Sequence, residues 1–313
     1  MKPSIKLIYS LTLLIIFIPA CEDNQPPAPT QTGEDIIPDE EITLANCSED
    51  INENVPAFFQ KYFKCVDVDV DNNWIVISTD GSPPHQSWYY PSGHPNYIDF
   101  ESQGEGYYQN PNEIQPQDIV MSIPVNPTPR GIQITETGVD GEVGTDPNEF
   151  GMGARGTSLD GVALFNPLAA PGDDIEDEKY SFDYYNGHPE MTGMYHYHTT
   201  TKGPLEVLEH EGLIQTPTPG SGEIEVYGIM CDGTVILGCT ELDSSSPIAS
   251  ELDAQNGHVH DMVDENGTTH FTNRYHTHIC TEQFTNHKFT PELMYYDRCE
   301  MVAMELQELK IVD

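Results

Sequence analysis

Short runs of β-branched and aromatic residues recur along the chain beyond residue 46, and turn-forming Asx-Gly pairs separate them. Short apolar runs between turn signals are typical of β-strands. The runs lie at residues 74–78, 132–135, 162–165, 224–228 and 234–237. The Asx-Gly pairs are Asp80-Gly81, Asp140-Gly141, Asp160-Gly161, Asp232-Gly233 and Asn266-Gly267. We therefore expect a single, mainly β domain over residues 46–313, with a few helices.

A helical spacing of apolar residues occurs in two places, residues 51–64 and 291–309, and predicts a helix in each. Residues 67–71 alternate Asp with Val and imitate the start of a calcium-binding loop. They lack the central Gly and the terminal Glu of such a loop, so we interpret them as a strand. The acidic segment 173–178 is expected to be a solvated connection.

The first 45 residues are organised like an export signal followed by a tether. Lys2 and Lys6 precede an apolar run that extends from Leu7 to Ile18. This arrangement is typical of a signal peptide, and the run is too short to span a bilayer. The next residues, Pro-Ala-Cys, resemble the end of a bacterial lipobox, which implies cleavage before Cys21 and lipid attachment to its sulfur. An ordinary signal peptide, with Cys21 incidental, is the alternative.

We therefore divide the chain into a signal peptide (1–20), an acylated cysteine with a disordered Pro- and acid-rich linker (21–45), and a folded domain (46–313). The expected location is the bacterial cell envelope, as an outer-membrane lipoprotein facing the periplasm or the cell surface. Its expected membrane contact is the lipid anchor at Cys21.

The formal net charge of −40 argues against a nucleic-acid partner, because phosphate backbones are bound by Lys and Arg.

Six cysteines remain besides Cys21, and an even number in an exported protein predicts disulfides. Sequence proximity favours the pairs Cys47–Cys65, Cys231–Cys239 and Cys280–Cys299. No Cys-x-x-Cys motif is present, so thiolate ligation of a metal is the less favoured interpretation.

Histidine pairs carry the candidate chemistry. The motif His-x-His occurs three times, as His196/His198, His258/His260 and His276/His278. Alternate residues of a strand point to one face, so both imidazoles of a pair can approach one ion. Their partners in the same strand, such as Tyr195 and Tyr197, then face the opposite side and are expected to pack in the core.

The histidine motifs form a degenerate internal repeat. Asn-Gly-His precedes His-x-His in both copies, ending at His188 in the first and at His258 in the second. Two such modules are expected to face each other across a pseudo-twofold axis. His85 and His270 are weaker ligand candidates. Asp183 and Asp261 are expected to hydrogen-bond the imidazole nitrogens that face away from the metal, and so to fix the orientation of the rings.

Imidazole-rich sites suit zinc and copper best, and iron is also compatible. We therefore predict a transition-metal site built from these histidines. The alternative is a network of hydrogen-bonded histidines and tyrosines that only stabilises the core.

The run Tyr195-His196-Tyr197-His198 resembles the YHYH domain family of bacterial exported proteins. Three further segments support the resemblance, at residues 77–85, 156–167 and 183–188, and the similarity extends over roughly residues 65–280. It implies a single domain in which His85, Asp183, His188, His196 and His198 occupy recurrent positions. The second copy departs from the pattern, because Thr277 replaces the second tyrosine. The family implies no particular activity.

Three hypotheses for function remain open. The first is a metal-dependent extracytoplasmic enzyme, and the second is a non-catalytic metal-handling lipoprotein. The third is a glycan- or surface-binding module with structural histidines. The chain has no Gly-x-Ser-x-Gly motif, P-loop or dinucleotide fingerprint that would select an enzyme class.

Overall fold

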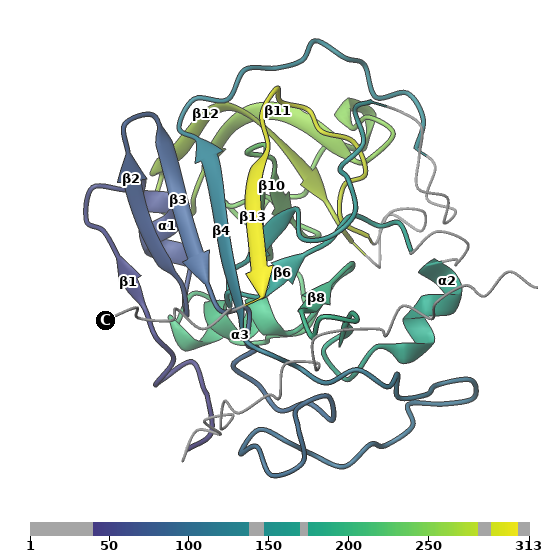
Figure 1. Ribbon diagram of the computed structural model, residues 1–313. Coiled ribbons are helices and arrows are strands. Elements are labelled where there is room, and N and C mark those ends of the chain that lie inside the picture. The colour runs from purple at the N-terminus through teal and green to yellow at the C-terminus, as the bar shows by residue number, and fades with distance from the viewer. Residues whose placement is uncertain (1–39, 138–146, 170–174, 281–288, 306–313) are drawn as a thin grey trace, which may run out of the picture. The chain divides into compact units, whose positions relative to one another are not determined.

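The computed structural model describes residues 40–137, 147–169, 175–280 and 289–305, and their strands form two sheets (Figure 1). The chain is mainly β, as predicted, with a single domain and short helices. The expected signal peptide, Cys21 and most of the linker lie outside the described residues.

The first sheet has five strands in the order β1-β2-β3-β4-β13. They are β1 (Asp50–Ile51), β2 (Asp67–Asp71), β3 (Trp74–Thr79), β4 (Gln117–Pro124) and β13 (Glu300–Glu305). In β2 the aspartates face solvent while Val68 is buried, which confirms the strand predicted from the Asp/Val alternation. The strand predicted at residues 74–78 is confirmed as β3.

The second sheet has eight strands in the order β11-β12-β10-β9-β5-β6-β8-β7. They are β5 (Gly156–Ser158), β6 (Ala163–Leu164), β7 (Gly187–Pro189), β8 (Tyr195–Tyr197), β9 (Val226–Met230), β10 (Val235–Leu237), β11 (Gly257–Val263) and β12 (Thr269–His278). Read outward from its centre, each half repeats one pattern: a hairpin, then a parallel strand, then an antiparallel strand. The sheet therefore contains the predicted duplication.

Strand register shows that the two halves are related by a pseudo-twofold axis. Thr157 of β5 and Ile229 of β9 occupy equivalent places in their hairpins, opposite Ala163 and Val235. These two equivalent residues also pair with each other where β5 meets β9 in antiparallel fashion. A twofold axis thus passes between them.

One unbroken row of paired residues crosses all eight strands. Directly paired residues point to the same face of a sheet, so the histidines at both ends of the row share one face. The row reads His188, His196, Ala163, Thr157, Ile229, Val235, His276 and His258. Five strand spacings of about 4.8 Å separate His196 from His276, which corresponds to about 24 Å across the sheet.

The two sheets share a core. Ile75, Ile77 and Met121 of the first sheet are fully buried in one cluster with Leu164 and Tyr197 of the second. In Figure 1 the five-stranded sheet lies in front of the eight-stranded one. Burial of this apolar surface is the main force that holds the sheets together.

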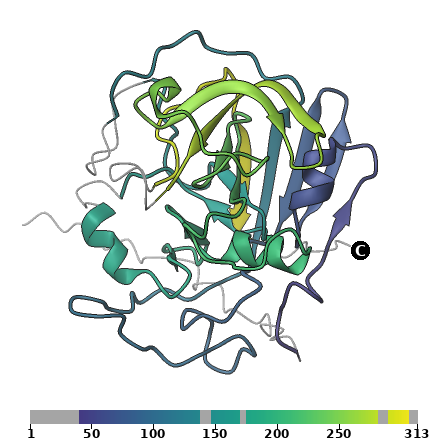
Figure 2. The ribbon, with the colours of Figure 1, turned by 180° about the vertical axis from the view of Figure 1, so that it is seen from behind.

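Helices are short and cover the sheets locally. They are α1 (Ala57–Tyr62), α2 (Ile175–Glu178) and α3 (Gly203–His210), with 3₁₀ turns at Lys179–Ser181 and Ala249–Glu251. Helix α3 buries Leu205, Val207 and Leu208 and contacts β9. Figure 2 shows this helix, in green, from behind. Among the described residues, no helix has the length and apolar character needed to cross a bilayer.

Three local predictions need correction. The helix expected at residues 291–309 is wrong for its described part, because residues 300–305 form β13 and pair with β4 along its full length. The helix expected at 51–64 is confined to α1, since β1 ends at Ile51 and Phe63 is extended. The run at residues 132–135 forms no strand, although Ile134 is buried against Tyr275 and Tyr296. In each case contacts with distant segments override a local pattern.

The disulfide prediction is correct for one pair of three. Cys47–Cys65 is confirmed, but the others are Cys231–Cys299 and Cys239–Cys280. Strands β10 and β12 run parallel, with Leu237 opposite His278. Cys239 and Cys280 each lie two residues farther on, so parallel pairing brings them together. Proximity in sequence cannot detect such a pairing.

Peptide mapping without reduction tests this connectivity. We expect one fragment that joins Cys239 to Cys280 and another that joins Cys231 to Cys299. Reduction should separate each fragment into two peptides. A fragment held by a Cys231–Cys239 bond would contradict the arrangement of β10 beside β12.

Candidate metal centres

An Asp-x-x-Asn-Gly-His loop introduces the first histidine of each module. The loop asparagines, Asn186 and Asn256, have left-handed backbones with φ of 57° and 56°. Asparagine tolerates this conformation better than most residues do, which explains its place before Gly-His. In the first loop, the Asp183 carboxylate accepts hydrogen bonds from the backbone of Tyr185 and Gly187. Asp253 does the same for Gln255 and Gly257 in the second loop.

A hydrogen bond from a tyrosine side chain fixes each loop to the following strand, and we call this contact the tyrosine lock. Tyr195 donates to Asp183 at 2.7 Å, and Tyr275 donates to Asp253 at 2.8 Å. The loop glycines make room for these rings. A Cβ atom would lie 2.5 Å from the Tyr195 ring at Gly187 and 1.9 Å from the Tyr275 hydroxyl at Gly257. The tyrosines are buried in the core and alternate with the histidines along their strands, as predicted.

Three histidines of the first module converge. The Nε2 atom of His196 lies 3.1 Å from Nε2 of His188 and 3.0 Å from Nε2 of His198. The three ring nitrogens lie within 4.8 Å of one another, and all three residues are buried. We call this group the first centre.

The opposite nitrogens of the first centre face hydrogen-bond acceptors. Nδ1 of His196 lies 3.0 Å from the carbonyl oxygen of Met194, and Nδ1 of His198 lies 2.6 Å from that of Asn166. Nδ1 of His188 faces the Ser181 hydroxyl, which donates its own proton to a backbone carbonyl. Each Nδ1 therefore carries the ring hydrogen, and each Nε2 presents a lone pair to its neighbours.

Burial keeps these imidazoles neutral. It lowers the pKa of His188 and of His196 well below the ordinary value, with a smaller contribution from neighbouring histidines. It lowers the pKa of His198 to about 4. Phe165 stacks on His196 with ring centres 3.7 Å apart and closes one side of the centre. The first centre is thus a set of neutral nitrogen donors at neutral pH.

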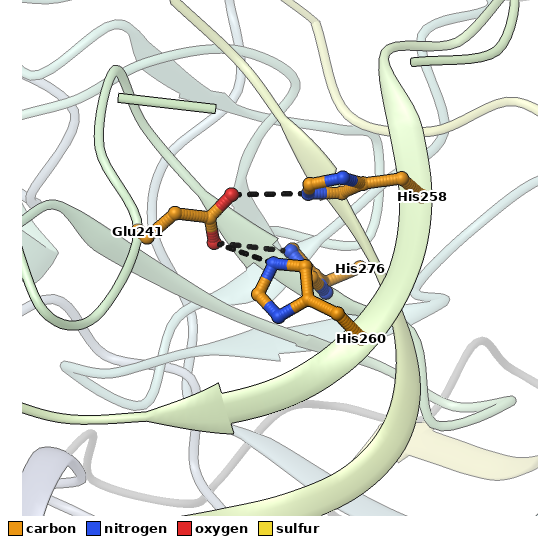
Figure 3. A group of neighbouring side chains, drawn as sticks. All are labelled: Glu241, His258, His260 and His276. Carbon is orange, nitrogen blue, oxygen red and sulfur yellow. Dashed lines mark hydrogen bonds and ion pairs between the residues drawn. The ribbon is translucent and has the colours of Figure 1, made fainter. Parts of the chain in front are cut away.

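The second centre has four histidines around one carboxylate. Oε1 of Glu241 lies 3.0 Å from Nε2 of His258 and 3.2 Å from Nε2 of His278. Oε2 lies 3.3 Å from Nε2 of His260 and 3.2 Å from Nε2 of His276. Figure 3 shows Glu241 opposite His258, His260 and His276.

Backbone carbonyls orient this second set in the same way. They accept from Nδ1 of His260, His276 and His278, at 2.7, 3.0 and 2.9 Å. Burial by itself raises the pKa of Glu241, but the close imidazoles of His258, His276 and His278 outweigh burial, so the pKa lies well below its ordinary value. Burial lowers the pKa of His276 to about 4. With the hydrogens of His260, His276 and His278 on Nδ1, the Nε2 atoms of these rings turn lone pairs toward the Glu241 carboxylate, and a cation between them would resolve this arrangement.

The seven main candidate histidines all belong to these two centres, while the two weaker candidates do not. His85 stacks on Tyr185 and hydrogen-bonds the Tyr197 hydroxyl. His270 faces Asp264, which also pairs with Lys61. Both therefore have structural partners elsewhere in the described part of the chain.

The two aspartates that were expected to orient imidazoles accept hydrogen bonds from backbone N–H groups instead. Asp183 binds the loop and tyrosine described above, and the Asp261 carboxylate accepts from the backbone of Asn273. Only the main-chain oxygen of Asp261 contacts a histidine, His260. Main-chain carbonyls beside the strands take the expected role, because their fixed positions orient an imidazole without burying another charge.

Sequence reasoning missed two carboxylates. Glu241 lies four residues beyond β10, and its approach to β11 and β12 depends on the strand pairing. Glu178 is in the acidic segment expected to be a solvated loop, but it ends α2 and its Oε1 lies 3.6 Å from Nε2 of His188. Only the parallel partnership of β10 with β12 would have pointed to Glu241.

The family model described as YHYH protein matches residues 122–253. Over these residues the chain is similar to the YHYH family. The match covers the first centre and Glu241, but it ends before the other residues of the second centre, which sit in the duplicated module. No curated protein and no solved structure matches the chain. The YHYH match thus confirms the resemblance that the tetrapeptide indicated.

Substituting the loop glycines tests the tyrosine lock. Because a Cβ atom at Gly187 or Gly257 overlaps a tyrosine, Gly187→Ala and Gly257→Ala are each expected to lower the free energy of unfolding by about 2 kcal/mol or more. Gly267→Ala is the control, since its φ of +79° is strained but its surroundings are open, at a cost of about 1 kcal/mol. Urea unfolding measures both, and equal effects at Gly257 and Gly267 would contradict the lock.

Acid should destabilise the metal-free protein through its buried histidines. The folded-state pKa of His198, about 4, lies below its unfolded value of about 6.5. The unfolded chain therefore binds the proton first, and stability is lost as the pH falls below 6.5. Between pH 6.5 and 5, in the presence of a chelator, we expect the parent to lose about 2 kcal/mol more than His198→Gln. Parallel losses in the two proteins would contradict a buried neutral imidazole.

Proposed function

We propose that this chain is a transition-metal-binding protein of the cell envelope with two histidine centres. One observation carries the proposal. In six of the seven histidines of the two centres, all but His258, Nδ1 lies against a backbone or hydroxyl oxygen, so Nε2 lone pairs face one another or a carboxylate. Unpaired buried acceptors cost free energy, and a cation among them would satisfy the whole cluster at once.

A purely structural histidine network is the less favoured alternative. Nε2 of His196 has two imidazole neighbours at about 3 Å, and the hydrogens of His196 and His198 are already donated to carbonyls. A proton could bridge one contact, but burial opposes the protonated form in this centre. A bound metal satisfies all three nitrogens together.

The donors favour zinc or copper, and iron remains compatible. Imidazole suits these metals, with nitrogen–metal distances of about 2.0–2.1 Å for zinc. Bonds of this length at tetrahedral angles place neighbouring nitrogens about 3.3 Å apart, which is slightly more than the Nε2 separations of 3.0 and 3.1 Å in the first centre.

Three disulfides support a location outside the cytoplasm, where such bonds persist. We combine them with the signal-like N-terminus to propose a lipoprotein anchored at Cys21 in the outer membrane. The strong negative charge suits a soluble domain held away from the bilayer by its linker.

One observation favours a metal-dependent enzyme as the second candidate. His188 lines a cavity of about 970 Å³ together with Glu178 and Ser181. Three protein ligands with room for a fourth are typical of catalytic zinc sites, where a nearby carboxylate can act as a base. The residues indicate no particular substrate.

Elemental analysis tests the central proposal. The untagged chain beyond Cys21 should bind two metal ions per molecule. His196→Gln and His276→Gln should each lose one ion, because each removes a central ligand of one centre, and the double variant should lose both.

His210→Gln provides the matched control. His210 is exposed at the end of α3 and belongs to neither centre, so this variant should keep both ions. Near-ultraviolet circular dichroism checks that the variants are folded. Unchanged metal content in His196→Gln and His276→Gln would contradict the proposal.

A further inference from the structure

The pseudo-twofold axis allows the two centres to be compared position by position. The carbonyls of Asn166 and Gly238 play the same role, each accepting from Nδ1 of the last histidine of its module. Three residues beyond them lie Ala169 and Glu241, respectively. The first centre therefore has a buried alanine at the position from which Glu241 enters the second.

The fourth histidine of the second centre also has no counterpart in the first. His260 follows His258 by two residues, and the equivalent residue after His188 is Glu190. The Glu190 carboxylate accepts from the side chain and backbone of Thr192 and from the backbone of Met194. These hydrogen bonds hold the Glu190 carboxylate in the turn that follows it. The first centre keeps three imidazoles, and the second has four with a carboxylate.

This difference changes which ion charge each centre favours. The free energy of burying an ion rises steeply with its charge unless buried groups of opposite charge compensate. Glu241, whose side chain is 10% exposed, provides such compensation in the second centre. Glu178 lies 3.6 Å from Nε2 of His188 and its side chain is 24% exposed, so it compensates an ion in the first centre less than Glu241 does in the second. A singly charged ion suits the first centre better.

Methionines give independent support. Met152, Met191, Met194 and Met301 line the 970 Å³ cavity onto which His188 opens. Met191 is 91% exposed, which is unusual for so apolar a side chain. The 410 Å³ cavity at the second centre contains one methionine, Met262, which is itself buried. Thioether sulfur is a soft ligand that selects Cu(I) among the biological metals.

We propose that the first centre is a Cu(I) site loaded through the methionine-lined cavity, while the second centre holds a divalent ion such as Zn²⁺. This inference rests on the proposed metal-binding function and assigns a different ion to each centre. Three neutral imidazoles match the preference of Cu(I) for low coordination and low site charge. The methionines offer it transient ligands on the way in.

Competition titrations test the assignment on the full mature chain. Cu(I), kept reduced by ascorbate without oxygen, is titrated against a colorimetric Cu(I) chelator, and Zn²⁺ against a colorimetric zinc chelator. His276→Gln, which disables the second centre, should still bind one Cu(I) at least 100-fold more tightly than His196→Gln does. For Zn²⁺ the order of the two variants should be reversed.

Stopped-flow mixing with the Cu(I)–chelator complex tests the entry route. Met152→Leu/Met191→Leu conserves volume and removes two thioethers at the cavity. It should slow loading at least tenfold and leave the stoichiometry unchanged. Met262→Leu, at the other centre, is the matched control and should load at the parent rate.

The outcomes separate this inference from the proposed function. Two bound ions with no Cu(I) preference at the first centre would overturn the inference and leave the metal-binding function intact. Loading at the parent rate in the methionine double variant would overturn the entry route. If neither metal binds either centre in the parent, the proposed function itself is wrong.

Discussion

The antiparallel pairing of β5 with β9 is the constraint on which the arrangement of the protein depends. Thr157 and Ile229 are equivalent residues of two modules and face each other directly, so the modules are related by a twofold axis at that point. Each module would otherwise expose the edge of a four-stranded sheet. Their union makes one sheet and places both centres on the same face, at opposite ends of one row of paired residues.

Within each module, other groups hold the candidate metal ligands in place. An aspartate binds the loop backbone, a tyrosine reaches it through the core, and a glycine leaves space for the ring. Backbone carbonyls then set the rotation of the imidazoles. The histidines are consequently oriented by the fold itself, and their side chains are already ordered before any ligand is bound.

The duplicated modules have diverged at their ligand positions while keeping this support. The loop aspartate, the Asn-Gly-His turn and the first tyrosine of the motif occur in both. Ala169 and Glu190 stand where the second module has Glu241 and His260. The two similar scaffolds therefore differ in their buried charge and in the methionines that neighbour them.

The sequence by itself determined what depends on consecutive residues. Alternation along a strand put His196 with His198, and His276 with His278, on one face and the tyrosines on the other. The repeated Asn-Gly-His segments revealed the duplication, and the tetrapeptide indicated the YHYH family. Only the tertiary structure decided which groups meet across strands: His188 with His196, Glu241 with the second set, Cys239 with Cys280, and β13 with β4. These contacts follow from the register and direction of strands far apart in the chain, and local periodicity carries no information about either.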